Sequence, residues 1–368
     1  MLHEVIEIFK SVHHLFSHYL RVLKLFKGFN SVTYCEDKSQ LKSKLSVFVD
    51  FLYLFFVLRV FPANYFLFQF DCKKRKQFRV YMDESSSPIL KRKLYECLWD
   101  EHYDYLVHDK YLFQCFCGYH NLAVPQIYGM YRNGEFYGDG FDLKDVMSKN
   151  SLERVVLKPA RGALGEGIHF ILRKQLDSLP DNGKFEDYFK ELLKKGDFIV
   201  QEVLSQHPEL SRINPSSVNT VRIITFLSSG GQVNFLAAIL RTSSGVSALD
   251  NFSLGGIVIG IDLKSGKLLD RGFMRPEFGT TVRKHPITNF EFKNFEVPLW
   301  KEVKEVAENA QKAFHYLKSI GWDIAVTPER PVLIEGNVEW GNAGIQAANG
   351  GLLTEKNKEL FSQYGLHI

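Results

Sequence analysis

Three oxygen-bearing side chains near the carboxyl end of the chain could bind a divalent cation. Asp323, Glu335 and Asn337 lie in the stretch GWDIAVTPERPVLIEGN, where two short apolar runs flank a turn-like segment. If Val326 pairs with Val332 in a hairpin, Asp323 lies opposite Glu335, and Asn337 shares their face. Two carboxylates and an amide oxygen suit Mg²⁺ beside nucleotide phosphates. A hairpin whose acidic side chains merely face water would have the same sequence.

A glycine-rich loop between two apolar segments could hold a polyphosphate. The stretch RVVLKPARGALGEGIHFILR, residues 154–173, predicts strand, loop and strand, with Gly162, Gly165 and Gly167 in the loop. Glycines let backbone N–H groups approach phosphates closely, and Lys158 before the loop supplies a cation. The pattern is neither a Walker A loop nor a dinucleotide fingerprint, because the glycine order and the following strand fit neither. A plain glycine hairpin is the alternative interpretation.

Further basic residues precede and follow that loop. Lys110 begins a predicted helix that ends near Gly118, and a cation there opposes the helix dipole, so a phosphate-binding role is worth considering. Arg222 and Arg241 lie on two apolar strands joined by a glycine turn, and buried guanidinium groups need anions. A regular ladder places the two arginines on opposite faces of the sheet. A bulge, or a structural role for one arginine, is therefore required.

The elements that position these residues belong to a globular chain with two or three packed units. The chain has 368 residues, 45% of them hydrophobic, and a net charge of +4, so its charge requires no partner such as a nucleic acid. Five cysteines without zinc-like spacing indicate reduced thiols in a cytoplasm. The opening residues do not have the pattern of a signal peptide. The last helix before the acidic hairpin is expected at residues 299–320.

The first 95 residues are predicted to be a helical module. Residues 2–27 have the apolar spacing of an amphipathic helix with a basic face, which we expect to pack on the rest of the protein, with an anionic membrane surface as the alternative. Residues 40–70 predict further helix. The apolar run at residues 51–62 is interrupted by Arg59 and is too short to span a membrane, so it predicts a buried helix.

Together, these motifs resemble those of the ATP-grasp enzymes. Lys110, the Lys158 loop, the strand end Gln201-Glu202-Val203, Arg222, and then Asp323, Glu335 and Asn337 occur in the order found in that superfamily. The phrases QHPELSRINPSSVNTVRIIT, DNFSLGGIVIGID and GWDIAVTPERPVLIEGN look like its sugar-transfer-associated branch, over roughly residues 95–350. The resemblance implies an α+β fold in which two subdomains clamp ATP, with a helical N-terminal module. It divides the chain into residues 1–95, 96–205 and 206–368.

The resemblance also implies a role for each motif. Lys110, Lys158, Gly165 and Gly167 would contact the ATP phosphates. Gln201, Glu202 and Val203 would border the adenine, with Glu202 or His207 as the ribose contact. Asp323, Glu335 and Asn337 would hold Mg²⁺, and Arg222, Arg241 and Lys158 would be the catalytic cations. Asn251, Gly255 and Gly256 would lie near the acceptor carboxylate.

The implied activity is that of an ATP- and Mg²⁺-dependent carboxylate–amine ligase, which forms an amide through an acyl phosphate. The branch suggests a sugar acid of a surface (capsular) polysaccharide as the carboxylate and an amino acid or amino sugar as the amine. A kinase that uses the same cleft and a nucleotide-dependent scaffold of a glycan-assembly complex are the alternatives. The expected location is the cytoplasm, with the inner face of the membrane as an alternative. The sequence does not define the oligomeric state.

Overall fold

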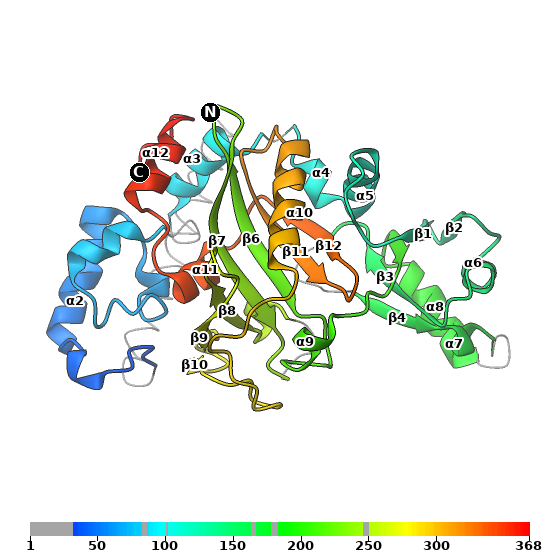
Figure 1. The fold of residues 1–368 in the computed structure, drawn as a ribbon, viewed down its shortest axis with the longest axis horizontal. Coiled ribbons are helices and arrows are strands. Elements are labelled where there is room, and N and C mark those ends of the chain that lie inside the picture. Colours follow the sequence, from blue (N-terminus) through cyan, green and yellow to red (C-terminus); the bar gives the residue numbers. More distant parts are fainter. Residues whose placement is uncertain (1–31, 83–86, 101, 163–166, 178–182, 246–249) are drawn as a thin grey trace, which may run out of the picture.

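Two antiparallel sheets organise the computed structural model, which describes residues 32–82, 87–100, 102–162, 167–177, 183–245 and 250–368 (Figure 1). Within these residues the larger sheet has the strand order β10-β9-β8-β7-β6-β11-β12 and the smaller sheet the order β2-β1-β5-β3-β4. The strands are β1 (Ile127–Arg132), β2 (Glu135–Gly138), β3 (Arg154–Pro159), β4 (His169–Leu172), β5 (Phe198–Gln201), β6 (Thr220–Leu227), β7 (Val233–Thr242), β8 (Ile257–Ile261), β9 (Leu268–Phe273), β10 (Thr281–Val282), β11 (Ser319–Val326) and β12 (Pro331–Asn337).

Helices pack around both sheets, so the fold is of the α+β class, as expected. The α-helices are α2 (Lys44–Leu52), α3 (Pro88–Leu98), α4 (Tyr105–His108), α5 (Lys110–Tyr119), α6 (Leu143–Lys149), α7 (Arg173–Asp177), α8 (Gly183–Leu193), α9 (Pro208–Ser211), α10 (Trp300–Ala313), α11 (Asn342–Asn349) and α12 (Glu355–Ser362). The short 3-10 helices are η1 (Lys38–Gln40), η3 (Pro62–Asn64), η4 (Arg75–Val80) and η6 (Phe252–Leu254), and η2 (Tyr53–Leu58) is a π-helix.

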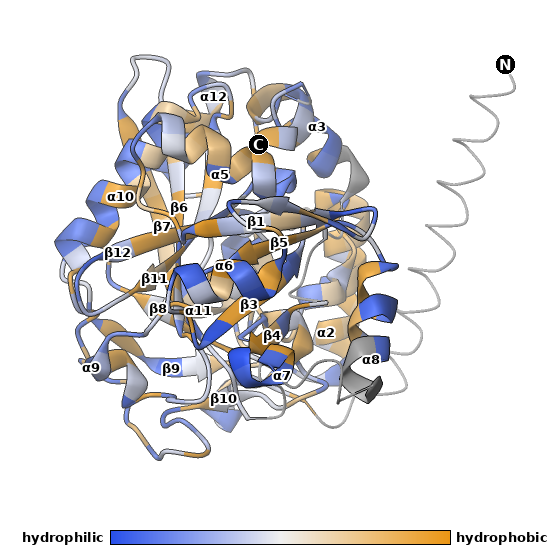
Figure 2. Ribbon diagram, turned by 90° about the vertical axis from the view of Figure 1, so that its right-hand side faces the viewer, coloured by the Kyte–Doolittle hydropathy of each residue, from blue (hydrophilic) through white to orange (hydrophobic). Residues whose placement is uncertain are grey.

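One face of the larger sheet is covered by α10, and the other face carries the polar site. Thr225 Oγ1 donates to Gln311 Oε1 of α10 (2.6 Å), and Trp322 Nε1 donates to the same hydroxyl (2.8 Å). Because successive side chains of a strand alternate between faces, Arg222 and Asp323 point to the opposite side. Figure 2 shows hydrophobic and hydrophilic residues alternating along α10, as expected for a helix with one buried face. This helix ends before the predicted residue 320 because β11 begins at Ser319.

The smaller sheet has its own core on one face and leaves the other face to the site. Val155 and Leu157 of β3 are buried with Phe198 of β5 and with residues of α6, α7 and α8. The alternate residues Val156 and Lys158 therefore face the other side, toward the larger sheet. The strand–loop–strand prediction for residues 154–173 is confirmed by the β3–β4 pairing.

The N-terminal part of the chain is joined to the larger sheet by buried contacts. Residues from Tyr34 to Met82 belong to the same hydrophobic core as β6, β7 and β11. The Tyr34 hydroxyl donates to the Met274 carbonyl (2.6 Å), and Trp99 Nε1 donates to the Ser319 carbonyl (2.9 Å). In Figure 1 the blue helix α2 lies at one end of the molecule and the green smaller sheet at the other. None of the described helices is long and apolar enough to cross a membrane.

Several predictions for the N-terminal region need correction or cannot be judged. The predicted helix at residues 2–27 lies outside the described residues. The helix predicted at 40–70 is divided into α2, η2 and the short η3, because Arg59 takes a left-handed conformation (φ 55°) and Pro62 follows. The prediction of a buried helix at residues 51–62 is wrong for its outer side, where Phe55, Phe56 and Val57 are exposed. By contrast, the helix predicted from Lys110 is confirmed as α5.

Candidate functional site

A cavity of about 650 Å³ lies between the two sheets and collects most of the predicted site residues. Its lining includes residues of α5, β3, β4 and the end of β5 on one side, and residues of β6, β7, β11 and β12 on the other. The predicted residues in its lining are Lys110, Lys158, Gly167, Gln201, Glu202, Val203, Arg241, Asn251, Asp323 and Glu335. Arg222, Asn337, His207, Gly255 and Gly256 are not among the lining residues, and Gly165 lies outside the described residues.

The acidic hairpin forms as β11 and β12, and Asp323 pairs with Glu335 as predicted. The predicted pairing of Val326 with Val332 is wrong, because Val326 pairs with Pro331. A bulge at Ile334 adds one residue to β12 and restores the expected facing of the two carboxylates. The Asn337 amide donates weakly to the Glu335 carboxylate (3.4 Å), so it lies beside the pair.

Both arginines reach Asp323 from one face of the sheet. A second bulge, at Leu236 of β7, pairs Arg241 with Thr220, which lies two residues from Arg222 on β6. Of the two alternatives that the sequence left open, the bulge is therefore present. Arg222 donates from Nε and Nη2 to the two Asp323 oxygens (2.6 Å each), and Arg241 Nη1 donates to Oδ2 (2.7 Å). Such charge-assisted, bidentate pairing fixes the carboxylate geometrically.

The two carboxylates of the hairpin have opposite electrostatic environments. Burial would raise the pKa of Asp323, but the charges of Arg222 and Arg241 outweigh it and hold this pKa below its usual range. Burial, and then the negative charge of Asp323, raise the pKa of Glu335, whose nearest cationic atom is Arg222 Nη2 at 3.9 Å. The negative charge of the half-buried Glu335 is thus poorly compensated, and a positive charge closer than 3.9 Å would stabilise it.

This donor set fits a hard divalent cation. Glu335 and Asp323 offer carboxylate oxygens and Asn337 an amide oxygen, the ligand types that Mg²⁺ prefers. A cation would also relieve the repulsion between the two carboxylates. In the part of the chain that the structure describes, no three His, Cys, Asp or Glu side chains form a metal-binding group. The third protein ligand would therefore have to be a neutral oxygen such as that of Asn337.

Two lysines enter the cavity from the side of the smaller sheet. Asp109 caps α5 by accepting from the Tyr111 N–H (3.0 Å), which fixes Lys110 in the first turn. The Lys110 ammonium donates to the Gly162 carbonyl of the glycine loop (2.8 Å). On β3, burial lowers the pKa of Lys158 to about 8. Two ammonium groups at a glycine-rich loop can hold a polyphosphate.

The end of β5 contributes both polar and apolar residues to the cavity. Glu202 cannot offer its N–H to an adenine without breaking a bond, because that N–H donates to the Gln126 carbonyl (2.9 Å). Val203 and Leu204 follow in the lining, with Ile334 opposite them on the hairpin. Sequence reasoning missed Phe170, which pairs with Val156 on the cavity side of the smaller sheet and is 62% exposed. In the predicted strand–loop–strand pair, every second residue of the second strand shares the face of Lys158, and this alternation could have identified Phe170.

His207 lies outside the cavity lining and has a structural role. Its N–H donates to the Val326 carbonyl (2.8 Å), and its Nδ1 accepts from the Glu209 N–H (3.2 Å), which caps α9. These bonds attach α9 to the end of the acidic hairpin. His207 therefore holds the hairpin in position and does not itself line the cavity.

The far end of the cavity is built around Asp250, which precedes the predicted residue Asn251. Asp250 Oδ1 accepts from Arg241 Nη2 (3.0 Å), and its Oδ2 accepts from the Thr220 hydroxyl. Asn251 uses its side-chain oxygen to accept from the Ser253 N–H (2.8 Å), and its carbonyl accepts from the Gly256 N–H (2.9 Å). A Cβ on Gly256 would lie 2.3 Å from the Asp250 carbonyl oxygen, so only glycine fits there.

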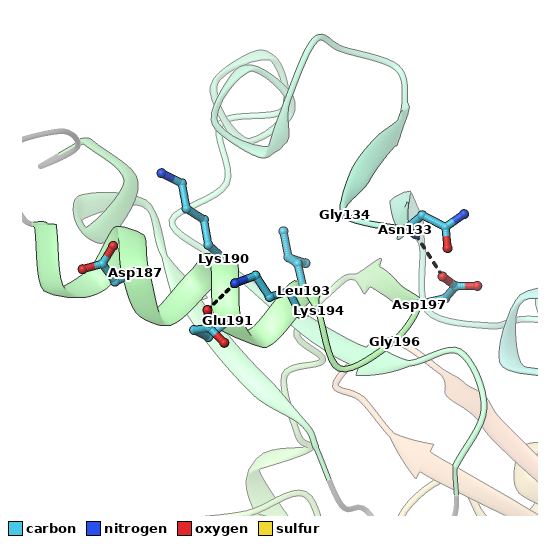
Figure 3. A pocket seen from close by; sticks show the side chains of 9 residues that line it. All are labelled: Asn133, Gly134, Asp187, Lys190, Glu191, Leu193, Lys194, Gly196 and Asp197. Carbon is cyan, nitrogen blue, oxygen red and sulfur yellow. Dashed lines mark hydrogen bonds and ion pairs between the residues drawn. The ribbon is translucent and has the colours of Figure 1, made fainter.

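A second pocket lies on the outer side of the smaller sheet and has a different character (Figure 3). It lies between the β1–β2 turn and the end of α8, and its charged side chains pair locally. The Asn133 N–H donates to Asp197 (3.2 Å), and Lys194 pairs with Glu191. None of the predicted site residues lines this pocket, so it adds nothing to the chemistry of the cavity.

Comparisons with known proteins agree with this architecture. Residues 90–360 match the family model described as sugar-transfer associated ATP-grasp. No curated protein is significantly similar to the chain. Similar solved structures include N5-carboxyaminoimidazole ribonucleotide synthetase from Thermotoga maritima, with 12% identity, a TM-score of 0.41 and coverage of 71% of this chain and 50% of that chain. Biotin carboxylase from Campylobacter jejuni has 12% identity, a TM-score of 0.44 and coverage of 72% and 48%.

A third similar structure is D-alanine–D-alanine ligase from Bacillus anthracis, with 13% identity, a TM-score of 0.40 and coverage of 70% of this chain and 68% of that chain. The chain spans about half the length of the first two proteins. Similarities at this level are too weak to define a shared activity. The family match is stronger evidence, because it covers most of the chain and includes every described residue of the cavity. ATP-grasp enzymes are ATP-dependent and use Mg²⁺, and the chain belongs to the sugar-transfer associated ATP-grasp family.

Proposed function

We propose that this protein is an ATP- and Mg²⁺-dependent carboxylate–amine ligase that works through an acyl phosphate. One observation carries the proposal: Lys110 and Lys158 from one side, and Arg241, Asp323 and Glu335 from the other, line a single cavity of about 650 Å³. A cavity with two ammonium groups, a guanidinium group and two carboxylates suits a nucleotide triphosphate with its metal and a second anionic substrate.

In the proposed reaction, a carboxylate oxygen of the first substrate attacks the γ-phosphorus of ATP, and ADP leaves. The amine nitrogen of the second substrate then attacks the acyl carbon, phosphate leaves with the electrons of the C–O bond, and the nitrogen loses a proton. Lys110 and Lys158 would hold the phosphates in line, and Arg241 would face the transferred phosphoryl group from the acceptor end. Mg²⁺, held by Asp323, Glu335 and Asn337, would neutralise phosphate charge.

Arg222 has a different place in this proposal from the one the resemblance implies. Its two short bonds to Asp323 and its position outside the cavity lining favour a positioning role, in which it holds a metal ligand. Arg241 lies at the acceptor end, so we assign the contact with the carboxylate substrate to Arg241 and Asn251, with Asp250 holding the guanidinium group in place.

The finer parts of the proposal concern substrates and location. We propose a sugar acid of a surface polysaccharide, or a precursor of one, as the carboxylate, and an amino acid or amino sugar as the amine. We also propose that the protein works at the cytoplasmic face of a membrane, beside glycan assembly. The division into residues 1–95, 96–205 and 206–368 goes with this proposal, with the cavity between the second and third parts.

The test is a measurement of stoichiometry with the purified full-length chain. We expect ADP and phosphate in equal amounts, and only when ATP, Mg²⁺, an acid and an amine are all present. A stable phosphorylated product that forms without an amine would instead identify a kinase, and AMP formation would exclude both reactions. Lys158→Met should remove turnover, whereas Lys264→Met, in an exposed turn, should not. Cellular function that persists in a Glu335→Gln variant would identify a scaffold.

A further inference from the structure

The helix α2 and the π-helix η2 that continues it are apolar on two opposite faces. The inner face, formed by Val47, Phe51 and Leu54, is buried in the main core. The opposite face presents Leu45, Val49, Leu52 and Phe56, which are 73%, 39%, 40% and 69% exposed. We call these four residues the outer face. A helix that is apolar all round normally has both sides covered, so the outer face requires a partner.

Neither the proposed ligase chemistry nor the packing of the described residues uses the outer face. In Figure 1, α2 lies at the end of the molecule away from the smaller sheet, and none of its residues lines the cavity. The inner face packs into the core through Phe51, and the buried Asp50 beside it pairs with Lys42 and Arg75 at 2.6 Å. Packing among the described residues therefore explains one side of the helix, and the other side remains for a further interaction.

The charge of the segment that carries the outer face indicates the kind of partner. Residues 32–82 contain nine lysines and arginines and four acidic residues, a net charge of +5, whereas the whole chain has a net charge of only +4. Asp50 and Asp71 are buried, Glu36 pairs with Arg283, and Asp37 caps η1, so all four acidic side chains are engaged. Lys44, Arg59, Lys74 and Lys76 are exposed and form no ion pair within the described part of the chain.

We propose that the outer face inserts into an anionic lipid surface, with Lys44, Arg59, Lys74 and Lys76 among the lipid headgroups. Exposed leucine and phenylalanine side chains on a helix with Lys44 and Arg59 at its two ends, in a segment of net positive charge, are the features of a helix that lies in a membrane interface. A second copy of the chain is disfavoured, because two surfaces with a net positive charge would face each other. The inference rests on the membrane location proposed above and names its surface, but it is independent of the reaction in the cavity.

The test is sedimentation of the full-length chain with vesicles of phosphatidylcholine alone, or of equal parts phosphatidylcholine and phosphatidylglycerol. We expect binding to the anionic vesicles only, weakened by salt at about 0.5 M, as for charge-dependent adsorption. Leu52→Asp with Phe56→Asp should lower the partition coefficient at least about tenfold, and so should Lys74→Glu with Lys76→Glu. The matched controls are Phe141→Asp, at a residue that is 94% exposed elsewhere, and Lys264→Glu with Lys293→Glu.

Each outcome has a defined meaning. Equal binding to both vesicle types, or binding that survives the outer-face substitutions, overturns the proposal. So does a wild-type dimer that the outer-face substitutions dissociate, because the face would then join two copies of the chain. Circular dichroism of each variant shows whether it is folded, and the lysine pair tests the surface without touching the helix. ADP release is measured separately, so failure of the ligase proposal and failure of lipid binding can be told apart.

Discussion

Asp323 and Glu335 face each other across one strand pair, yet the structure predicts opposite effects on stability when each loses its charge. Asp323 is 3% exposed and accepts three short bonds from two guanidinium groups. Glu335 lies 3.4 Å from the Asn337 amide and 3.9 Å from Arg222 Nη2, and its carboxyl group hydrogen-bonds to that of Asp323. Folding lowers the pKa of Asp323 and raises the pKa of Glu335. The folded state therefore favours the charged form of Asp323 and disfavours the charged form of Glu335.

The expected magnitudes follow from burial. Asp323→Asn would leave two largely buried arginines without their shared anion, and breaking a buried pair in this way costs about 3–5 kcal/mol. Arg241 would keep Asp250 at 3.0 Å, which places the estimate toward the lower value, about 3 kcal/mol. Glu335→Gln would remove a poorly compensated negative charge. Its free energy of unfolding should stay the same or rise by up to about 1 kcal/mol, as often follows when a site is relieved of a functional charge.

Urea unfolding followed by tryptophan fluorescence can measure both effects, because Trp322 and Trp340 are buried beside the site. Glu305→Gln, on an exposed ion pair of α10, is the control and should change stability by less than about 0.5 kcal/mol. Both site variants should lose turnover, but only Asp323→Asn should lose stability. Equal destabilisation by the two substitutions, or none from Asp323→Asn, would show that the arginines do not depend on that carboxylate.

Three further predictions concern other parts of the chain. Gly256→Ala should destabilise the protein by more than about 2 kcal/mol, because the added Cβ would meet the Asp250 backbone. Gly118→Ala in α5, where the added Cβ would have open space, should instead stabilise the protein by about 0.5–1 kcal/mol. Thermal unfolding of the two variants measures both effects. Burial lowers the pKa of Lys73 to about 8 from 10.5, so its burial cost is fully present below pH 8 and disappears as the pH rises to 10.5. The free energy of unfolding should increase between pH 8 and pH 10.5 by at most about 3 kcal/mol, and by less because Lys73 is partly exposed. In urea titrations at several pH values, Lys73→Met should remove this dependence of stability on pH. Arg222→Lys should reduce turnover mainly by raising the Mg²⁺ concentration needed for half-maximal rate, because one ammonium cannot replace two bonds to Asp323; an unchanged Mg²⁺ requirement would contradict the positioning role.

The sequence predicted the parts of the site that depend on local order. Lys110 at a helix start, Lys158 before a glycine loop and the facing of Asp323 and Glu335 all follow from short-range patterns, and the structure has each of them. The sequence did not place Asp250, because its bonds to Arg241 and Thr220 depend on how β6 and β7 pair. The sequence also predicted burial for the whole apolar run at residues 51–62, whereas Phe55, Phe56 and Val57 are exposed. Hydrophobicity indicates that a side chain favours an apolar contact, but it does not identify which surface supplies that contact.

Two bulges explain why strand alternation alone could not assemble the site. Without the extra residue Leu236, Arg241 would point to the α10 face, and without Ile334, Glu335 would point away from Asp323. A bulge sacrifices about one ladder hydrogen bond, a net loss of about 1 kcal/mol, whereas a buried arginine without an anion costs several times as much. The bulged registers are therefore more stable than the regular ones, because they bring buried arginine and carboxylate groups together. A pattern that counts residues in twos cannot contain this information, since the deciding energy comes from a carboxylate 82 residues away from Arg241.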